Sequence, residues 1–183
     1  MRNWLQRETC RFSFGVLLVV AIVVVVPAAA FAQEEHRSSF AASTFKGVIF
    51  DPTTYAPALI AYDATMRDWN SSQPLFRSGY VELNERFTVS GLPRDVPVSY
   101  QIGNRRIVGD AFANLGMSVV NNVADRVFER ILTDRFPTHR KVVRTLGWIE
   151  RSAFASYMSY QLSAAHYRQA STNVRLAEQL GLR

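Results

Sequence analysis

The chain of 183 residues carries 21 basic and 15 acidic side chains, a net charge of +6, and 48% hydrophobic residues. That hydrophobic content is typical of a globular protein and excludes a disordered one. With 7 prolines and 9 glycines, collagen-like and Pro/Gly-rich low-complexity classes are excluded too. The one cysteine, Cys10, cannot form an internal disulfide or a thiolate metal cage.

Residues 1–32 have the composition of an export signal. Three arginines precede an apolar run over residues 12–26, and Pro27 and an Ala-Phe-Ala sequence at residues 30–32 follow it. A basic segment, an apolar segment and a small-residue cleavage site in this order are typical of a signal peptide. We therefore predict cleavage after Ala32 and a mature chain without cysteine.

Residues 12–32 support a second interpretation, because about 20 apolar residues suffice to span a bilayer. Left uncleaved, they would make this a membrane-anchored accessory protein. Pro27 and the alanines after it weaken the last third of the segment and favour cleavage. The 19 arginines against two lysines indicate a GC-rich bacterial coding sequence. We therefore expect export to the periplasm or cell envelope.

The mature chain is predicted to begin with a flexible leader over residues 33–44, which are small, polar and without period. A single helical domain is expected over residues 45–183. It opens with a short apolar piece at 45–50 that is a strand or an extended arm. A first helix is predicted over about 55–69. An irregular segment over 70–97 follows, because Ser, Pro and Gly recur there.

Two long helices are predicted in the second half of the chain. A proline-free stretch from Ser99 to Phe136 carries apolar residues at helical spacing, and a second such pattern runs to about Leu180. The break between them is short, so we expect an antiparallel hairpin. Glycines such as Gly103 are expected to bend or interrupt helices of this length. The predicted fold class is mainly α, with one shorter helix and the irregular 70–97 segment beside the long-helix hairpin.

Two stripes of small residues indicate how the hairpin closes. They are Gly109, Ala113 and Gly116 in the first long helix and Ser152, Ser156, Ser159 and Ser163 in the second. Each stripe lies on one helix face, and folding the chain back at its break sets the two opposite each other. We predict a tightly packed seam between them, in which a leucine at position 156 would overpack.

A polar series also follows the two long helices. Its members are Asp110, Asn114, Asn122, Asp125, Arg151 and His166. An Asp–His pair can serve as a general base, so Asp110 and His166 are catalytic candidates and the other four are ligand-binding candidates. Because no nucleophile or oxyanion hole is evident, we expect instead a network of hydrogen bonds and ion pairs between the helices.

Aromatic residues recur along the second long helix. They are Trp148, Tyr157, Tyr160 and Tyr167. We expect them in the core, with the hydroxyls reaching polar neighbours. The alternative is an aromatic groove for lipid tails or for a partner helix.

The remaining motifs mostly exclude functions. The three histidines are dispersed and no His-Glu-x-x-His sequence occurs, so neither a metal site nor a cofactor is predicted. The small net charge argues against nucleic acid as a partner. A protein or a lipid of the envelope remains as partner, with membrane contact only if the signal segment stays uncleaved. We expect a non-enzymatic structural or binding module; the alternative is a small exported enzyme that uses Asp110 and His166.

Overall fold

The computed structural model describes residues 37–182, so the predicted signal peptide over residues 1–32 lies outside the described residues. Within that range the chain forms two compact units, residues 37–50 with 120–147 and residues 51–119 with 148–182. Each unit is described by itself.

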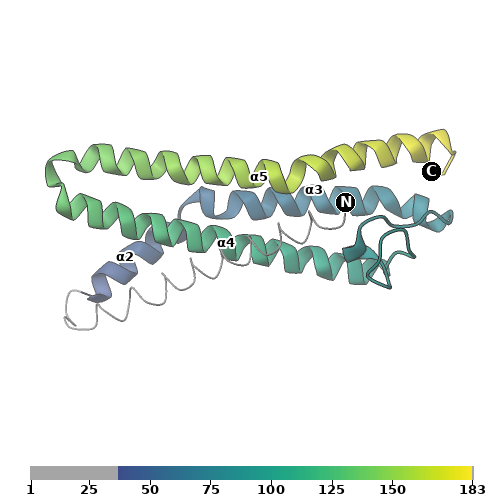
Figure 1. The fold of residues 1–183 in the computed structure, drawn as a ribbon, viewed down its shortest axis with the longest axis horizontal. Coiled ribbons are helices and arrows are strands. Elements are labelled where there is room, and N and C mark those ends of the chain that lie inside the picture. Colours follow the sequence, from purple (N-terminus) through teal and green to yellow (C-terminus); the bar gives the residue numbers. More distant parts are fainter. Residues whose placement is uncertain (1–36, 183) are drawn as a thin grey trace, which may run out of the picture. The chain divides into compact units, whose positions relative to one another are not determined.

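The fold is all-α, with two long helices packed antiparallel and a middle helix, as the sequence predicts. The helices in chain order are α2 (Arg37–Ile49), α3 (Pro52–Arg77), α4 (Tyr100–Arg135) and α5 (Arg140–Gln179), with short 3-10 turns at Glu85–Phe87 and Pro137–His139 (Figure 1). Between residues 37 and 182 the only β pairing is two isolated bridges, Glu82 with Asp95 and Thr88 with Pro97.

Helix α2 replaces the end of the predicted leader and the predicted strand or arm, so the prediction of irregular and extended backbone there is wrong. Its own sequence has no amphipathic period, but α4 offers it contacts in the same unit. Arg126 of α4 lies against Gly47, Arg130 of α4 lies 5.8 Å from the ring of Phe40, and Val48 is buried. Tertiary contacts therefore determine this helix where local propensity does not.

Helix α3 begins where the sequence indicates but ends later. Asp51 is its N-cap and accepts a hydrogen bond from the backbone N–H of Thr53, and Pro52 occupies the first turn. The helix continues to Arg77, so the predicted loop from residue 70 is wrong. Ser71 and Ser72 bond to the carbonyl oxygen of Asp68, which lets them stay helical. The irregular segment starts only at residue 78.

Helices α4 and α5 are each continuous, with 36 and 40 residues, so the expected interruption at glycines is wrong. At 1.5 Å per residue they are about 54 Å and 60 Å long. In α4, Gly103 does not break the helix, and it packs so closely against Trp69 that a Cβ there would clash with the indole ring. Gly109 and Gly116 have open space beside them instead.

The predicted seam between the small residues of α4 and the serines of α5 is also wrong. Gly109, Ala113 and Gly116 are exposed, as is Ser156, and only Ser163 of the serine stripe is buried. The buried positions of α3 and α5, two helices that are far apart in the sequence, instead carry many small residues. The buried small residues are Thr54, Ala58, Ala61, Ala64 and Ser72 on α3, and Ala155, Ser163, Ala170 and Ala177 on α5.

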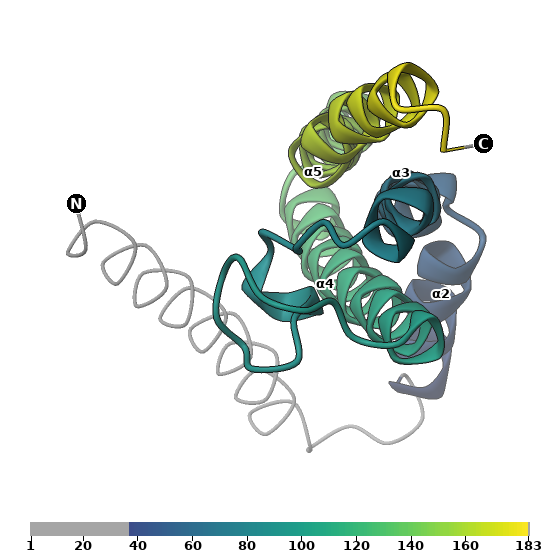
Figure 2. The same ribbon diagram turned by 90° about the vertical axis from the view of Figure 1, so that its right-hand side faces the viewer.

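Helix α3 lies along α5 and runs in the same direction (Figures 1 and 2). Asp51 pairs with Arg151, and Asp68 pairs with His166, so the partner's number rises along both helices. Small side chains let two helix backbones approach closely, and this face of α3 has almost nothing larger.

The apolar core of this unit forms at the other end of α3. Trp69, Phe87, Val98 and Ile107 are buried together, and Met66 and Phe76 pack against them. The rings of Trp69 and Phe87 have centroids 5.3 Å apart. Phe87 and Val98 belong to the irregular segment, so this cluster fixes that segment against α3 and α4.

Candidate functional site: the α3–α5 pocket

A row of polar contacts joins α3 to α5. The buried pair Asp51–Arg151 has Oδ2 and Nε 3.1 Å apart. Further along, the hydroxyl of Tyr167 donates to Asp63 at 2.8 Å, on the exposed edge. A third group at Asp68 lies deeper, between these helices and the irregular segment.

Asp68 is the centre of this third group. Its Oδ2 lies 2.8 Å from Nδ1 of His166, and its Oδ1 accepts a hydrogen bond of 3.1 Å from Nδ2 of Asn173. The same amide nitrogen donates to the hydroxyl of Ser72 at 2.8 Å, while Gln169 donates to the amide oxygen of Asn173. Asn173 is buried, so these bonds satisfy an amide that burial would otherwise penalise.

This group forms one wall of a cavity of about 340 Å³. That volume suits a small organic ligand. The polar lining residues are Thr65, Asp68, Ser72, Glu82, Asn84, His166, Gln169 and Asn173. The apolar and aromatic lining residues are Trp69, Leu75, Phe76, Tyr80, Val81, Leu83, Phe87 and Leu176. The α3–α5 pocket, as we call it, therefore combines acidic and hydrogen-bonding side chains with aromatic ones.

Glu82 brings a second carboxylate to the α3–α5 pocket. Burial raises the pKa of this carboxyl above its ordinary value, while the backbone N–H groups of Asn84 and Leu83 lower it in part. The charge of Asp68 raises the pKa further and His166 lowers it, so the three groups lie close enough to influence one another. Glu82 is thus a partly desolvated carboxyl that a cation would stabilise.

The sequence-predicted site residues are dispersed. His166 lines the α3–α5 pocket, but its carboxylate partner is Asp68 and not Asp110, which is ion-paired with Arg86. Arg151 is buried against Asp51, and Asn114 is half-buried on α4.

Asn122 and Asp125 belong to the other unit, where Asn122 is fully buried and Asp125 half-buried. Of the six predicted residues, the α3–α5 pocket therefore contains His166 alone.

Asp68, Glu82 and Asn173 were not among the predicted site residues. Asp68 lies at the end of the first predicted helix, and Asn173 occurs in a polar stretch without a motif. Spacing places Asp68 and Ser72 one turn apart on α3 and His166 and Asn173 two turns apart on α5, but it does not connect the two helices and does not mark Glu82.

Two further findings concern residues 37–182. No helix there combines the length and the apolar content needed to cross a bilayer. In the same range, no three His, Cys, Asp or Glu side chains gather where they could hold a metal ion.

No protein-family model, curated protein or solved structure matches this chain.

Proposed function

We propose that the protein is an exported, non-enzymatic binding module of the cell envelope, and that the α3–α5 pocket is its ligand site. The observation that carries the proposal is the division of the pocket lining between carboxylates and aromatic rings. Asp68 and Glu82 supply the carboxylates, and Trp69, Phe76 and Phe87 are among the rings.

This division favours a small organic amine over other ligands. An ammonium group is attracted both by a desolvated carboxylate and by the face of an aromatic ring. An apolar body attached to that amine would fill the rest of the cavity. A carboxylate ligand would instead meet Asp68 and Glu82 with like charge, and a neutral ligand would leave Glu82 without a counter-ion.

The test compares three matched probes, 2-phenylethylamine, 2-phenylethanol and 3-phenylpropanoate, by titration calorimetry on the purified chain. We expect the amine to bind most tightly, the alcohol more weakly and the carboxylate most weakly. Glu82→Gln should reduce amine affinity roughly 10-fold, since a desolvated charge contact is worth about 1–2 kcal/mol, and should leave the alcohol unchanged. Glu85→Gln removes an exposed carboxylate three residues away and is the matched control.

Binding of the amine should also release protons. Glu82 has a raised pKa, so part of its population is protonated near that value, and an ammonium group would expel the proton. Calorimetry in two buffers of different ionisation enthalpy measures this release. Absence of saturable amine binding, or preference for the carboxylate, would contradict the proposal.

A second candidate function is an exported enzyme, which the His166–Asp68 pair favours. A carboxylate on Nδ1 orients an imidazole so that its other nitrogen can accept a proton. The hydroxyls of Ser71 and Ser72 both donate to the carbonyl oxygen of Asp68 and not to His166. A folded His166→Asn variant that retains the full cellular phenotype would eliminate the enzyme.

A further inference from the structure

Helix α5 brings one ionisable side chain to the α3–α5 pocket, that of His166. The aromatic residues of α5 are exposed instead. Trp148, Tyr157 and Tyr160 are 61%, 61% and 65% exposed, and Tyr167 is 37% exposed, so the prediction that they lie in the core is wrong. The charge that α5 can present to a ligand in the pocket therefore depends on His166.

The two ring nitrogens of His166 have different environments. Nδ1 lies 2.8 Å from Oδ2 of Asp68, whereas Nε2 has no hydrogen-bond partner among residues 37–182. Because a carboxylate accepts hydrogen bonds, Nδ1 carries the proton when the ring is neutral, and Nε2 is then an acceptor. The ring lines the cavity and its side chain is 30% exposed, so Nε2 is the nitrogen available to a ligand.

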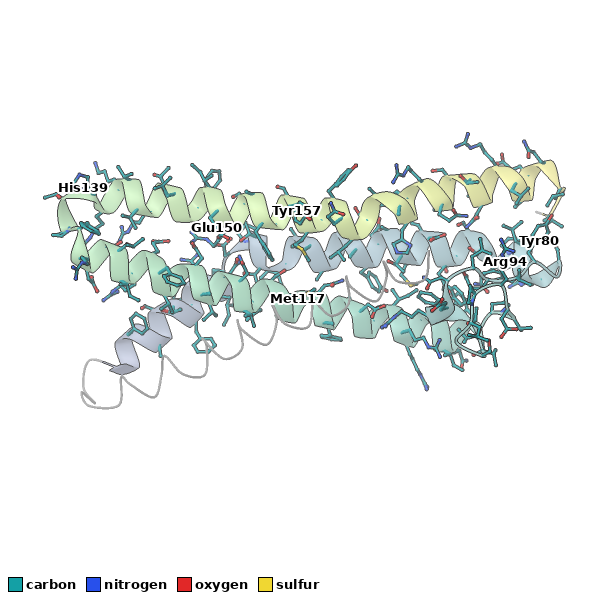
Figure 3. All side chains as sticks on the ribbon, in the orientation of Figure 1. Tyr80, Arg94, Met117, His139, Glu150 and Tyr157 are labelled. Carbon is teal, nitrogen blue, oxygen red and sulfur yellow. The ribbon has the colours of Figure 1, made fainter. Side chains whose placement is uncertain are left out.

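The ionisable groups that face His166 in the pocket are mostly carboxyls. Asp68 comes from α3, and Glu82 and Tyr80 come from the irregular segment, where Figure 3 labels Tyr80 close to the end of α3. None of the residues that line the pocket is Lys or Arg, and none belongs to α4. The only cation that the lining can supply is therefore a protonated His166.

The other ionisable side chains near this group have partners or positions of their own. Asp63 is bonded to Arg67 and Tyr167 at the exposed edge of α3 and α5. The carboxylate of Asp95 accepts from a backbone N–H of its own loop, and Arg168 is exposed. The charge balance in the pocket is therefore set by His166 and the two carboxyls of its lining.

An ammonium ligand would meet the two charge states of His166 very differently. The charge of His166 acts on the Glu82 carboxyl and lowers its pKa, so the two side chains lie within electrostatic range. An ammonium group beside Glu82 would be repelled by an imidazolium at that range. A neutral imidazole would instead accept a hydrogen bond from the ammonium at Nε2.

We propose that the α3–α5 pocket exchanges the proton of His166 for the ammonium group of its ligand. The amine binds when the imidazole is neutral, with Nε2 accepting from the ammonium, and the displaced proton leaves to solvent. This inference rests on the proposed function, since its ligand is the amine of that proposal. Histidine is the side chain that changes charge between pH 5 and 8, so acidification within this range releases the amine.

The exchange at His166 is distinct from the proton that an amine expels from Glu82. Protonation of Glu82 removes an attraction for the ammonium, whereas protonation of His166 adds a repulsion and turns an acceptor into a donor. Both effects weaken amine binding at low pH. Substitution of Glu82 is therefore needed to observe His166 alone.

The experiment is titration calorimetry of the purified full chain with 2-phenylethylamine between about pH 5.5 and pH 8, a range in which an alkylamine stays charged as lysine does. In Glu82→Gln we expect the amine affinity to fall about 5-fold or more from the upper to the lower pH, since one proton changes an affinity by at most about 10-fold per pH unit. In E82Q/H166Q the affinity should change less than about 2-fold, because no lining group titrates in this range.

Two controls isolate His166. His139→Gln in the Glu82→Gln background replaces an exposed histidine of the other unit and should retain the full pH dependence. The neutral probe 2-phenylethanol should bind with nearly the same affinity at every pH, because a hydroxyl can donate as well as accept. Circular dichroism verifies that every variant is folded.

A further measurement needs no substitution of His166. Titration of Glu82→Gln with the amine in two buffers of different ionisation enthalpy should show proton release near pH 6.5, where histidine ordinarily titrates. Amine binding without proton release at this pH would contradict the exchange.

The inference and the proposed function fail in different ways. An amine affinity of Glu82→Gln that is independent of pH, or a fall that persists in E82Q/H166Q, would overturn the exchange and leave the amine site intact. An equal fall for 2-phenylethanol would overturn it too, because repulsion between charges could not be the cause. A parent chain that does not bind 2-phenylethylamine at any pH would overturn both.

Discussion

At the scale of single residues, Asp51 combines two roles at the start of α3. Its carboxylate caps the helix by accepting from the N–H and the hydroxyl of Thr53, and it is ion-paired with Arg151. Both members of the pair are less than a tenth exposed. Removing one partner takes the opposite charge away from a buried ion, which is costly.

Arg151→Met should therefore destabilise the protein by about 3–5 kcal/mol, because the neutral side chain removes the ion-pair partner of the buried Asp51 carboxylate. Urea denaturation followed by circular dichroism measures the loss. Arg67→Met is the matched control, because the Arg67–Asp63 pair is 65% and 47% exposed and such a pair is worth about 0–1 kcal/mol. Equal effects of the two substitutions would contradict the structural role assigned to Arg151.

Glu82 predicts a pH dependence of stability with a definite sign. Its pKa is raised in the folded protein, so the folded state binds the proton more tightly than the unfolded state does. The stabilising contribution of the protonated form is complete below the ordinary value of 4.5 and is lost as the pH rises through the raised pKa.

Glu82→Gln should accordingly be more stable than the parent chain at neutral pH and equally stable below pH 4.5. The glutamine oxygen can still accept the hydrogen bond from the Asn84 N–H, which the parent carboxylate accepts at 2.7 Å. Denaturation midpoints across this pH range measure the difference in stability between Glu82→Gln and the parent chain, and Glu85→Gln is the control. A difference that is independent of pH would show that burial of the Glu82 charge is not its cause.

At the scale of helices, the glycines of α4 have two opposite environments. A Cβ at Gly103 would clash with the Trp69 ring, whereas a Cβ at Gly109 would have no neighbour within 4 Å. The first glycine is needed for close packing of α3 on α4. The second only adds conformational freedom to the unfolded chain.

Gly103→Ala should destabilise the protein by about 1–3 kcal/mol through overpacking. Gly109→Ala should stabilise it by about 0.5–1 kcal/mol, because alanine favours the helix and has room. Thermal unfolding measures the stability of both variants, and each variant serves as the control for the other. A stabilising Gly103→Ala would mean that Trp69 does not pack on this turn.

Local patterns explain why the helices and the antiparallel long-helix hairpin were predictable and the contacts of α3 with α5 were not. The limits of α4 and α5 follow from the proline-free stretch after Ser99 and from the break at Pro137. The end of α3 was predicted too early because Ser71, Ser72 and Pro74 are residue types typical of loops. The hydroxyls of the two serines instead donate to a carbonyl oxygen of the helix backbone.

The predicted small-residue seam failed for a different reason. The antiparallel packing of α4 and α5 is confirmed, but Gly109, Ala113 and Gly116 are exposed, and polar contacts join α5 to α3 as well. His166 could be singled out as a titratable residue on a helix. Asp68 could not be identified as its partner, because the two are 98 residues apart and no local spacing connects them.

At the scale of the whole molecule, the proposal of export makes its own prediction. Purified mature protein should begin at Gln33, which intact-mass measurement determines directly, because the Ala-Phe-Ala sequence at residues 30–32 fits the signal peptidase. Ala30→Asp together with Ala32→Asp should block cleavage and keep the chain in the membrane fraction. A mature protein that starts at Met1 would contradict cleavage and favour the anchored accessory protein.

The parallel alignment of α3 with α5 has a consequence for the order of assembly. The α3 surface that α5 covers lies in the first half of the chain, and α5 begins only at Arg140. Contacts between distant segments slow folding, and an incomplete chain exposes the surfaces that such contacts cover. The nascent chain therefore cannot cover this surface of α3 until α5 has emerged. A polypeptide that must pass a membrane pore before folding would gain the time it needs from that delay.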